Sequence, residues 1–213
     1  MQNLDLFASN KGIDILSDAS IVFRMIEKLD IDEKVNVINE IRKELKKYSP
    51  FASEPVDCVL WIRNDMVKAN DYNPNSVAPP EMKLLEHSIT EDGYTQPIVT
   101  FNLDTHNEVV DGFHRHRVGK ESATVRCRVH GYLPVVEINQ DREDKSDRMA
   151  ATIRHNRARG EHRVDSMSEI VIELKRRFWS DEKIAQELGM EPDEVLRLTQ
   201  VTGLAGLFAD REF

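Results

Sequence analysis

Strand-type sequence is confined to the middle of this 213-residue chain, and this restriction narrows the possible folds more than any other feature. Between Pro55 and Ile138, short segments rich in β-branched residues are separated by turn signals and helical stretches. On both sides of this region, apolar residues recur at helical spacing instead. The pattern predicts an α+β fold in three parts: an N-terminal helical extension at residues 1–50, a small domain of short strands and helices at 51–140, and an all-helical module at 141–213.

Both flanking regions predict helical units. The residues from Ala19 to Tyr48 predict a pair of helices with a break at 30–32, where Asp32 is a candidate N-cap. This pair has two readings, packing against the main domain or binding a partner, and the sequence leaves both open. After residue 139, helices are expected at 142–158 and 164–178. Residues 180–204 have the outline of a helix-turn-helix, with Gly189 at the turn.

The middle region predicts a sheet covered by helices. Strands are expected at 56–62, 97–101, 108–111 and 132–138, and helices at 81–92 and from Gly112 onward. Pro134 suggests that the last strand lies at an edge of the sheet, because proline lacks the N–H group that an interior strand donates.

Charge is distributed unevenly along the chain. The net charge of −9 would repel a polyanion if it were spread evenly. Residues 114–130 and 148–163 are nevertheless basic, and a common polyanionic ligand would explain both islands. No run of about 18 apolar residues and no signal peptide are present, so we expect a cytoplasmic protein without a membrane partner. Cys58 and Cys127 are interpreted as ordinary thiols, because no metal-binding motif surrounds them.

The run from Asp111 to Arg115 is the candidate anion cradle. It places a buried strand before a glycine and a basic helical turn, and a helix N-terminus offers unpaired N–H groups to an anion. His114 and Arg115 add donors suited to phosphate oxygens. Asp111 is a candidate Mg²⁺ ligand or an N-cap, and Phe113 is a base-stacking platform or a core residue. One residue of the pair His116 and Arg117 is expected to face solvent.

The order of these motifs resembles the ParB/sulfiredoxin-like N-terminal domain superfamily. The resemblance rests on Asn73-Pro74, on Gln96-Pro97-Ile98-Val99 after a helix ending in glycine, and on Asp111-Gly112-Phe113-His114-Arg115-His116-Arg117. It implies a small mixed-sheet domain that binds a nucleotide through Gln96, Gly112, Phe113, His114, Arg115 and Arg117. The Asp-Gly-x-His-Arg order is closer to the branches that use ATP or ADP, whereas the chromosome-partitioning members use CTP.

The second basic island fits the same resemblance. His155-Asn156-Arg157-Ala158-Arg159 stands where ParB proteins carry Glu-Asn-x-x-Arg, so Asn156 and Arg159 are expected near the phosphates. His155 replaces the glutamate that helps to bind Mg²⁺ in those proteins. The better carboxylate candidates for Mg²⁺ are therefore Asp111 and Asp71.

Over most of its length the chain resembles the IbrB proteins more closely still. The similar segments run from Tyr72 to Met82 and from Arg154 to Gly160. This resemblance implies a co-activator of prophage gene expression that works beside IbrA, a partner resembling phosphoadenosine-phosphosulfate (PAPS) reductase.

The first functional hypothesis is a nucleotide-responsive regulator associated with DNA. Arg197 and Gln200 on the second helix of the helix-turn-helix are the candidate base contacts. That helix starts with Glu191-Pro192-Asp193-Glu194, however, and these carboxylates would repel a polyanion. A purely structural helical module is the competing interpretation. The sequence leaves the oligomeric state undecided, with a homodimer as one possibility.

The second hypothesis is a Mg²⁺-dependent enzyme that hydrolyses ATP or transfers its terminal phosphoryl group. It rests on the resemblance to the free-serine-kinase and Asp-Gly-Gln-His-Arg ATPase branches. The catalytic candidates are Asp111 and Asp71, the latter as the base that accepts the proton of the nucleophile. Phe113 stands where sulfiredoxins have their cysteine, which disfavours the sulfiredoxin reaction.

Overall fold

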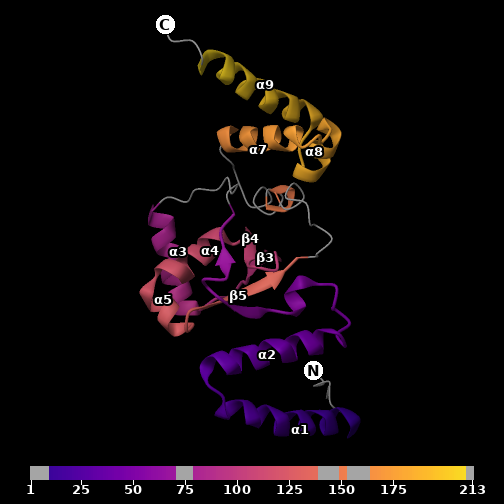
Figure 1. The fold of residues 1–213 in the computed structure, drawn as a ribbon, viewed down its shortest axis with the longest axis vertical. Helices are drawn as coiled ribbons and strands as arrows, with labels where there is room; N and C mark the ends of the chain where they lie inside the picture. The colour runs from indigo at the N-terminus through magenta and orange to yellow at the C-terminus, as the bar shows by residue number, and fades with distance from the viewer. Residues whose placement is uncertain (1–9, 71–78, 139–148, 153–163, 210–213) are drawn as a thin grey trace, which may run out of the picture. The chain divides into compact units, whose positions relative to one another are not determined.

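The computed structural model describes residues 10–70, 79–138, 149–152 and 164–209 (Figure 1). The chain divides into two compact units, residues 1–53 and residues 54–213. The boundary predicted at residue 140 lies in a stretch that is not described, so that division stays a prediction.

The first unit is the expected helix pair. It consists of α1 (Asn10–Arg24), the short 3-10 helix η1 (Met25–Lys28) and α2 (Ile31–Lys46). The N-cap of α2 is Asp30, whose carboxylate accepts a hydrogen bond from the backbone N–H of Glu33 at 2.9 Å. The prediction that Asp32 is the cap was wrong. Asp32 lies in the first turn of α2, because the backbone is already extended at Leu29 and Asp30.

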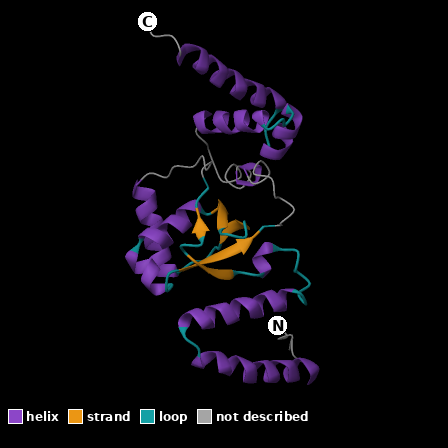
Figure 2. Cartoon of the chain, viewed as in Figure 1, coloured by secondary structure: helices purple, strands orange, loops and turns teal. Residues whose placement is uncertain are grey.

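The second unit is built on a five-stranded mixed sheet with the order β1-β5-β3-β4-β2, drawn in orange in Figure 2. The 3-10 helix η2 (Pro55–Asp57) precedes the strands, which are β1 (Leu60–Arg63), β2 (Val67–Lys68), β3 (Ile98–Asn102), β4 (Asn107–Asp111) and β5 (Tyr132–Glu137). Two neighbouring pairs, β2 with β4 and β3 with β5, are parallel, and the other two are antiparallel. The predicted α+β fold with a mixed sheet is confirmed.

The last strand lies inside the sheet rather than at its edge. β5 pairs with β1 on one side and with β3 on the other, so the edge position suggested by Pro134 was wrong. Successive residues of a strand direct their N–H groups to alternate neighbours, and a single proline therefore removes only one ladder hydrogen bond. Both faces of this strand are buried, and this explains why four of its six residues are large and apolar or aromatic, namely Tyr132, Leu133, Val135 and Val136.

Three helices complete this domain: α3 (Pro79–Asp92), α4 (Phe113–Glu121) and α5 (Ala123–Arg128). Ile89, Val118 and Val125 form their common core, and Tyr94 packs against both this cluster and the cluster of the sheet. The sheet cluster includes Leu60, Val67, Ile98, Val109, Leu133 and Val135. The two clusters fix α4 between its neighbouring helices and the sheet.

The C-terminal part of the second unit is helical, as predicted. It contains α7 (Val164–Arg176), α8 (Asp181–Leu188) and α9 (Pro192–Ala209). The hydroxyl of Ser180 accepts a hydrogen bond from the N–H of Lys183 at 3.2 Å and so caps α8, and Gly189 ends α8 with a φ of 62°. Val171, Leu174, Ile184, Leu188 and Val195 are among the buried side chains that hold these helices together. Of the helix expected at 142–158, the structure describes residues 149–152, which are helical.

Candidate functional site

The anion cradle lies where the most buried strand of the sheet passes into a helix. All five residues of β4 are buried, and the chain turns at Gly112 into the first turn of α4. Gly112 has a φ of 87°, a conformation that side chains disfavour. A Cβ atom at this position would lie 2.9 Å from Nη2 of Arg115 and 3.3 Å from the Cα of Ile98. The backbone conformation therefore favours glycine, and any side chain here would push the end of Arg115 away and crowd the backbone of Ile98.

Arg115 folds back over the start of its own helix. Its Nη2 lies 3.5 Å from Oδ2 of Asp111, and its Nη1 donates a hydrogen bond to the Oε1 of Gln96. Only 15% of the Arg115 side chain is exposed, and 4% of the Asp111 side chain. The structure thus brings together four of the predicted site residues, Gln96, Asp111, Gly112 and Arg115. It also shows that Arg115 makes the structural ion pair with Asp111 that competes with a purely ligand-binding role.

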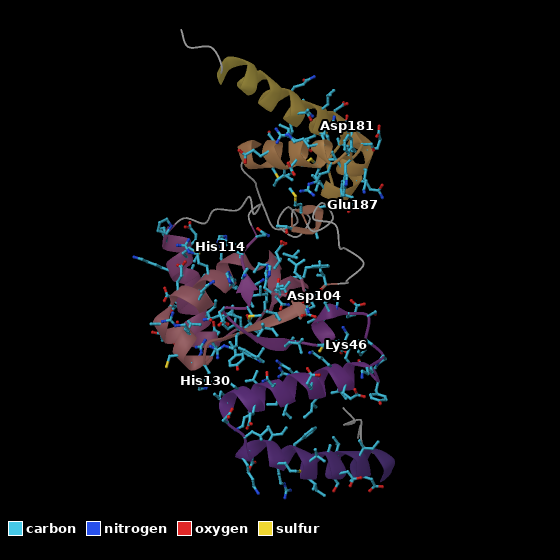
Figure 3. The ribbon with its side chains drawn as sticks, viewed as in Figure 1. Lys46, Asp104, His114, His130, Asp181 and Glu187 are labelled. Carbon is cyan, nitrogen blue, oxygen red and sulfur yellow. The ribbon has the colours of Figure 1, made fainter. Side chains whose placement is uncertain are left out.

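His114, labelled in Figure 3, has no polar partner in the described part of the chain. Both of its ring nitrogens are screened from solvent, and neither makes a hydrogen bond there. Burial lowers the pKa of His114, the nearby positive charge of Arg117 lowers it further, and Asp111 opposes this shift. The imidazole is therefore held neutral beside a helix N-terminus, where an anion would favour its protonated form.

Phe113 and Arg117 point to surroundings of different kinds. Phe113 packs against the core of the sheet and meets the ring of His114 edge to face at 5.5 Å between centroids. This contact agrees with the core interpretation of Phe113. Arg117 is exposed, and its Nε donates to both carboxylate oxygens of Glu121 at 3.0 and 2.9 Å.

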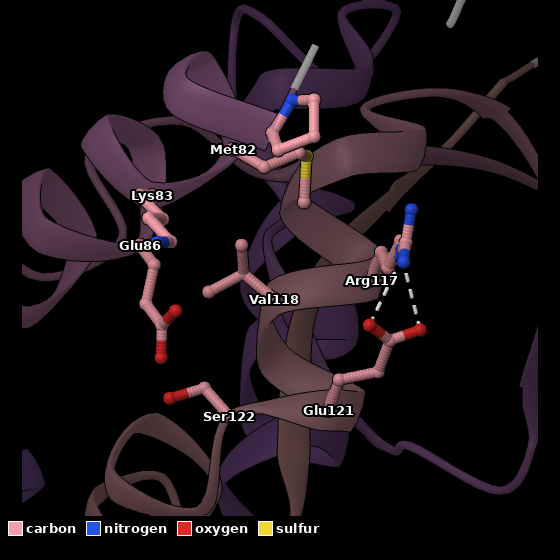
Figure 4. Close-up of a pocket in the computed structure, with 8 residues that line it drawn as sticks. Met82, Lys83, Glu86, Arg117, Val118, Glu121 and Ser122 are labelled. Atoms are coloured by element: carbon pink, nitrogen blue, oxygen red, sulfur yellow. Dashed lines mark hydrogen bonds and ion pairs between the residues drawn. The ribbon is translucent and has the colours of Figure 1, made fainter. Parts of the chain in front are cut away.

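Arg117 also lines a cleft of about 320 Å³ between α3 and α4, shown in Figure 4. Lys83 and Arg117 give this cleft positive charge, whereas Glu86 and Glu121 give it negative charge. The balance of charges gives the cleft no preference for an anion, in contrast to the start of α4.

Two residues that the sequence analysis did not single out position Arg115. The hydroxyl of Tyr94 donates a hydrogen bond to the backbone carbonyl of Arg115 at 3.0 Å, and burial raises the pKa of Tyr94 to about 12. Gly119 makes room for this contact, since a Cβ there would lie 2.1 Å from the Tyr94 hydroxyl oxygen. Glycine inside a short helix lowers stability relative to alanine. The position of Gly119 within the expected helix therefore indicated, in the sequence, that another residue packs closely against this helix.

His116 ties the same helix to the sheet. It is buried, and its Nε2 lies 3.0 Å from the carbonyl oxygen of Val67 in β2. Burial lowers the pKa of His116, and the contact with Val67 opposes this shift. Of the pair His116 and Arg117, Arg117 is therefore the residue that faces solvent, as the sequence analysis expected of one of them.

The candidate DNA contacts lie on the second helix of the helix-turn-helix. Arg197 and Gln200 are both exposed on α9 and are three residues apart, so they share a face. The Nε of Arg197 donates to the backbone carbonyl of Asp193 at 3.2 Å. Asp193 and Glu194 occupy the first turn of α9, as the sequence analysis anticipated.

Three candidate residues, Asp71, Asn156 and Arg159, lie outside the described residues. Within the described ranges, no group of three or more metal-ligating side chains is present. No helix in the same ranges is long and apolar enough to cross a membrane.

Comparison with known proteins identifies the relatives of this chain. YbdM of Escherichia coli (strain K12) is 54% identical over 191 residues, which cover 89% of this chain and 90% of YbdM. The chain belongs to the YbdM family. Residues 162–210 of this YbdM-family protein match the IbrB-like C-terminal HTH domain, which confirms the IbrB-type resemblance and the predicted helix-turn-helix.

Three solved structures are similar to parts of the YbdM-family chain. C-terminally truncated ParB from Caulobacter crescentus, complexed with CTP-γ-S, is 20% identical with a TM-score of 0.38, covering 68% of this chain and 78% of that chain. The same truncated protein complexed to the centromeric parS site is 17% identical with a TM-score of 0.44, covering 67% and 71%. A Pnob8-like ParB-N domain is 10% identical with a TM-score of 0.47, covering 66% and 69%. At these scores the overlap is too loose to transfer a ligand or a residue role.

Proposed function

We propose that this YbdM-family protein is a nucleotide-binding regulator in which the start of α4 binds the phosphates of a nucleoside triphosphate. The observation that carries the proposal is His114, whose two ring nitrogens are buried without a partner among the described residues. A buried polar group without a hydrogen bond is costly, and a bound ligand is one explanation for it. Because His114 lies in the first turn of α4, two residues after Gly112, the ligand that would satisfy it is an anion.

The residues around His114 suit a phosphate group in particular. The N–H groups of the first turn of α4 have no intrahelical partners, and Gly112 presents no side chain that would keep a ligand away. Arg115 adds a planar donor that matches two phosphate oxygens at once. Gln96 holds Arg115 in place, and Arg117, Asn156 and Arg159 are proposed as further phosphate contacts. We expect ATP or ADP as the ligand, with CTP as the other candidate.

Mg²⁺ fits this proposal through Asp111. Magnesium in nucleotide sites is usually bound by one or two carboxylates together with the phosphates, whose charge it neutralises. Asp111 is buried beside the cradle and has Arg115 as a charged neighbour. We propose the Asp111 carboxylate as a ligand of a Mg²⁺ ion bound with the phosphates, and Asp71 as a second carboxylate.

The regulatory part of the proposal rests on the C-terminal domain. An IbrB-like helix-turn-helix and the IbrB resemblance of the middle region support a co-activator of prophage gene expression. On the same grounds we propose a PAPS-reductase-like protein of the IbrA type as the partner. DNA is a second candidate partner, with Arg197 and Gln200 as the proposed contacts. A nucleotide ligand agrees with the cytoplasmic location expected from the sequence.

A thermal-shift panel tests the proposal. ATP, ADP, CTP, GTP and phosphoadenosine phosphosulfate are added with Mg²⁺, and a ligand that binds only the native state raises the melting temperature. No shift with any of them contradicts nucleotide binding. Steady release of phosphate or AMP from ATP that disappears in Asp111→Ala would assign the chain to the ATPase or phosphotransferase class instead.

A further inference from the structure

The first unit carries a large apolar surface and almost no core of its own. Among its residues with described side chains, 12–53, the one buried residue is Asn39. Large apolar side chains remain exposed on both helices, namely Ile13, Ile15, Leu16, Ile21, Val22, Phe23, Ile31, Val37 and Leu45. Helices of about 15 residues are marginal in water unless an amphipathic face is packed against something. The helix pair therefore needs a partner surface.

A groove between the two helices marks where that surface would fit. It has a volume of about 450 Å³, and its apolar lining comes from Phe23, Ile26, Ile38 and Ile41. Three charged residues also line the groove: Glu27, and the cations Lys34 and Arg42. In the described part of the chain, neither the charge of Glu27 nor that of Lys34 makes an ion pair or a hydrogen bond.

The charge pattern of this unit favours a second copy of the same chain. Residues 10–48 contain eight basic and eight acidic residues, whereas the whole chain has a net charge of −9. Because the chain is acidic overall, two copies repel each other, but residues 10–48 have no net charge and do not add to this repulsion. In a two-fold interface each contact is made twice with the roles exchanged, so Glu27 of each copy can face Lys34 of the other.

We propose that the α1–α2 pair is a homodimerisation module, in which two copies pack their grooves together as a four-helix bundle. Two antiparallel hairpins of this length match the simplest bundle arrangement, with apolar side chains inside and charged pairs at the rim. Residues 10–48 as a whole carry no net charge, so a strongly charged partner such as DNA would gain little electrostatic attraction from this unit.

The oligomeric state of the full chain tests this proposal. Sedimentation velocity over a concentration series should give a species of twice the 24.6 kDa chain mass. Ile38→Glu buries a charge in the groove and should raise the dimer dissociation constant at least about tenfold. Asn36→Glu adds the same charge to an exposed position of α2 outside the groove and should leave the dimer intact.

A charge swap separates a dimer contact from a folding defect. Glu27→Lys should weaken the dimer several-fold, and Glu27→Lys combined with Lys34→Glu should restore it, because each reversed charge again meets its opposite. Circular dichroism checks that every variant keeps its helix content. A wild-type chain that is monomeric at all concentrations, or a dimer that neither Ile38→Glu nor Glu27→Lys weakens, overturns the proposal.

Discussion

The starts of α4 and α9 show what makes a helix N-terminus available to an anion. The first turn of α4 contains no acidic residue, follows a glycine, and holds His114 and Arg115. The first turn of α9 contains Asp193 and Glu194, whose carboxylates already meet the positive end of the helix dipole. The same backbone feature therefore suits a phosphate at α4 and disfavours one at α9. The identity of three or four side chains decides between the two outcomes.

Glycine substitutions give the largest expected difference. Gly112→Ala combines a disfavoured φ with a 3.3 Å contact to the Cα of Ile98, and it displaces the end of Arg115. We therefore expect it to cost about 2 to 4 kcal/mol of stability and to abolish nucleotide binding. Gly189 is the matched control, since it also has a positive φ but no atom within 4 Å of the added Cβ. Gly189→Ala should cost only about 1 to 2 kcal/mol and leave binding unchanged. Urea unfolding measures the loss of stability, and calorimetry measures the loss of nucleotide affinity. Equal losses of both quantities in the two variants would contradict a special role for the start of α4.

Removal of Arg115 should mainly affect the ligand. Arg115→Ala deletes an ionic donor to phosphate and should weaken nucleotide binding by about 1.5 to 3 kcal/mol, or one to two decades. Arg115→Lys should recover part of the loss, because an ammonium group cannot make the bidentate contact. Arg176→Ala, at an exposed position on α7, serves as the control.

The contact between Arg115 and Asp111 provides the competing outcome for the same variant. If this ion pair mainly holds the loop, Arg115→Ala lowers the melting temperature of the unliganded protein and affinity falls little. Melting curves with and without nucleotide separate the two cases. The structural outcome would show that the start of α4 is stabilised internally, as α9 is.

Titration of His114 should affect nucleotide binding less than removal of Arg115 does. Burial keeps the pKa of His114 low in the free protein, and a bound phosphate would raise it. Affinity is then highest below the free-state pKa and falls as pH rises through the bound-state pKa, by less than about tenfold per pH unit. His114→Gln should flatten this profile. Isothermal calorimetry is the suitable method, because the lowered pKa of His116 also makes the fold less stable as pH falls below the ordinary histidine range.

Neutral side chains at the start of α9 should produce a modest gain in DNA binding. Changing Glu191, Asp193 and Glu194 to their amides removes repulsion and should increase retention on duplex DNA a few-fold at low salt. Arg197→Ala in that background should reduce the salt dependence by about one counterion. Glu169→Gln on α7 is the control for a general charge effect. No salt-sensitive retention of either the parent or the triple variant would rule out direct DNA binding by this face.

Deletion of residues 1–48 should have the smallest effect on the ligand. None of these residues has the phosphate-binding chemistry found from Asp111 to Arg117, so we expect the shortened chain to bind nucleotide with unchanged affinity. A folded deletion with weakened binding would contradict this expectation. If α1 and α2 form the dimer interface, the same shortened chain should sediment as a monomer.

Local features were predictable because they depend on neighbours in the sequence. The strand before Gly112, the helix after it and the glycine between α8 and α9 were all recognisable from short patterns. The order of helical and strand-type segments was enough to predict the α+β class. The prediction of the α2 cap failed by two residues, since two aspartates lie near the break and only the backbone decides which of them caps.

The remaining features depend on contacts between distant parts of the chain, and only the tertiary structure decided them. The sequence by itself determined a basic turn behind a glycine, but not that Gln96, 19 positions away, would bind Arg115, or that Tyr94 would reach its carbonyl across Gly119. It did not place β5 between β1 and β3, because pairing order follows from how both faces of the sheet are buried. It also could not show that His114 lacks a partner, because burial of its ring nitrogens arises only when the surrounding elements pack around them.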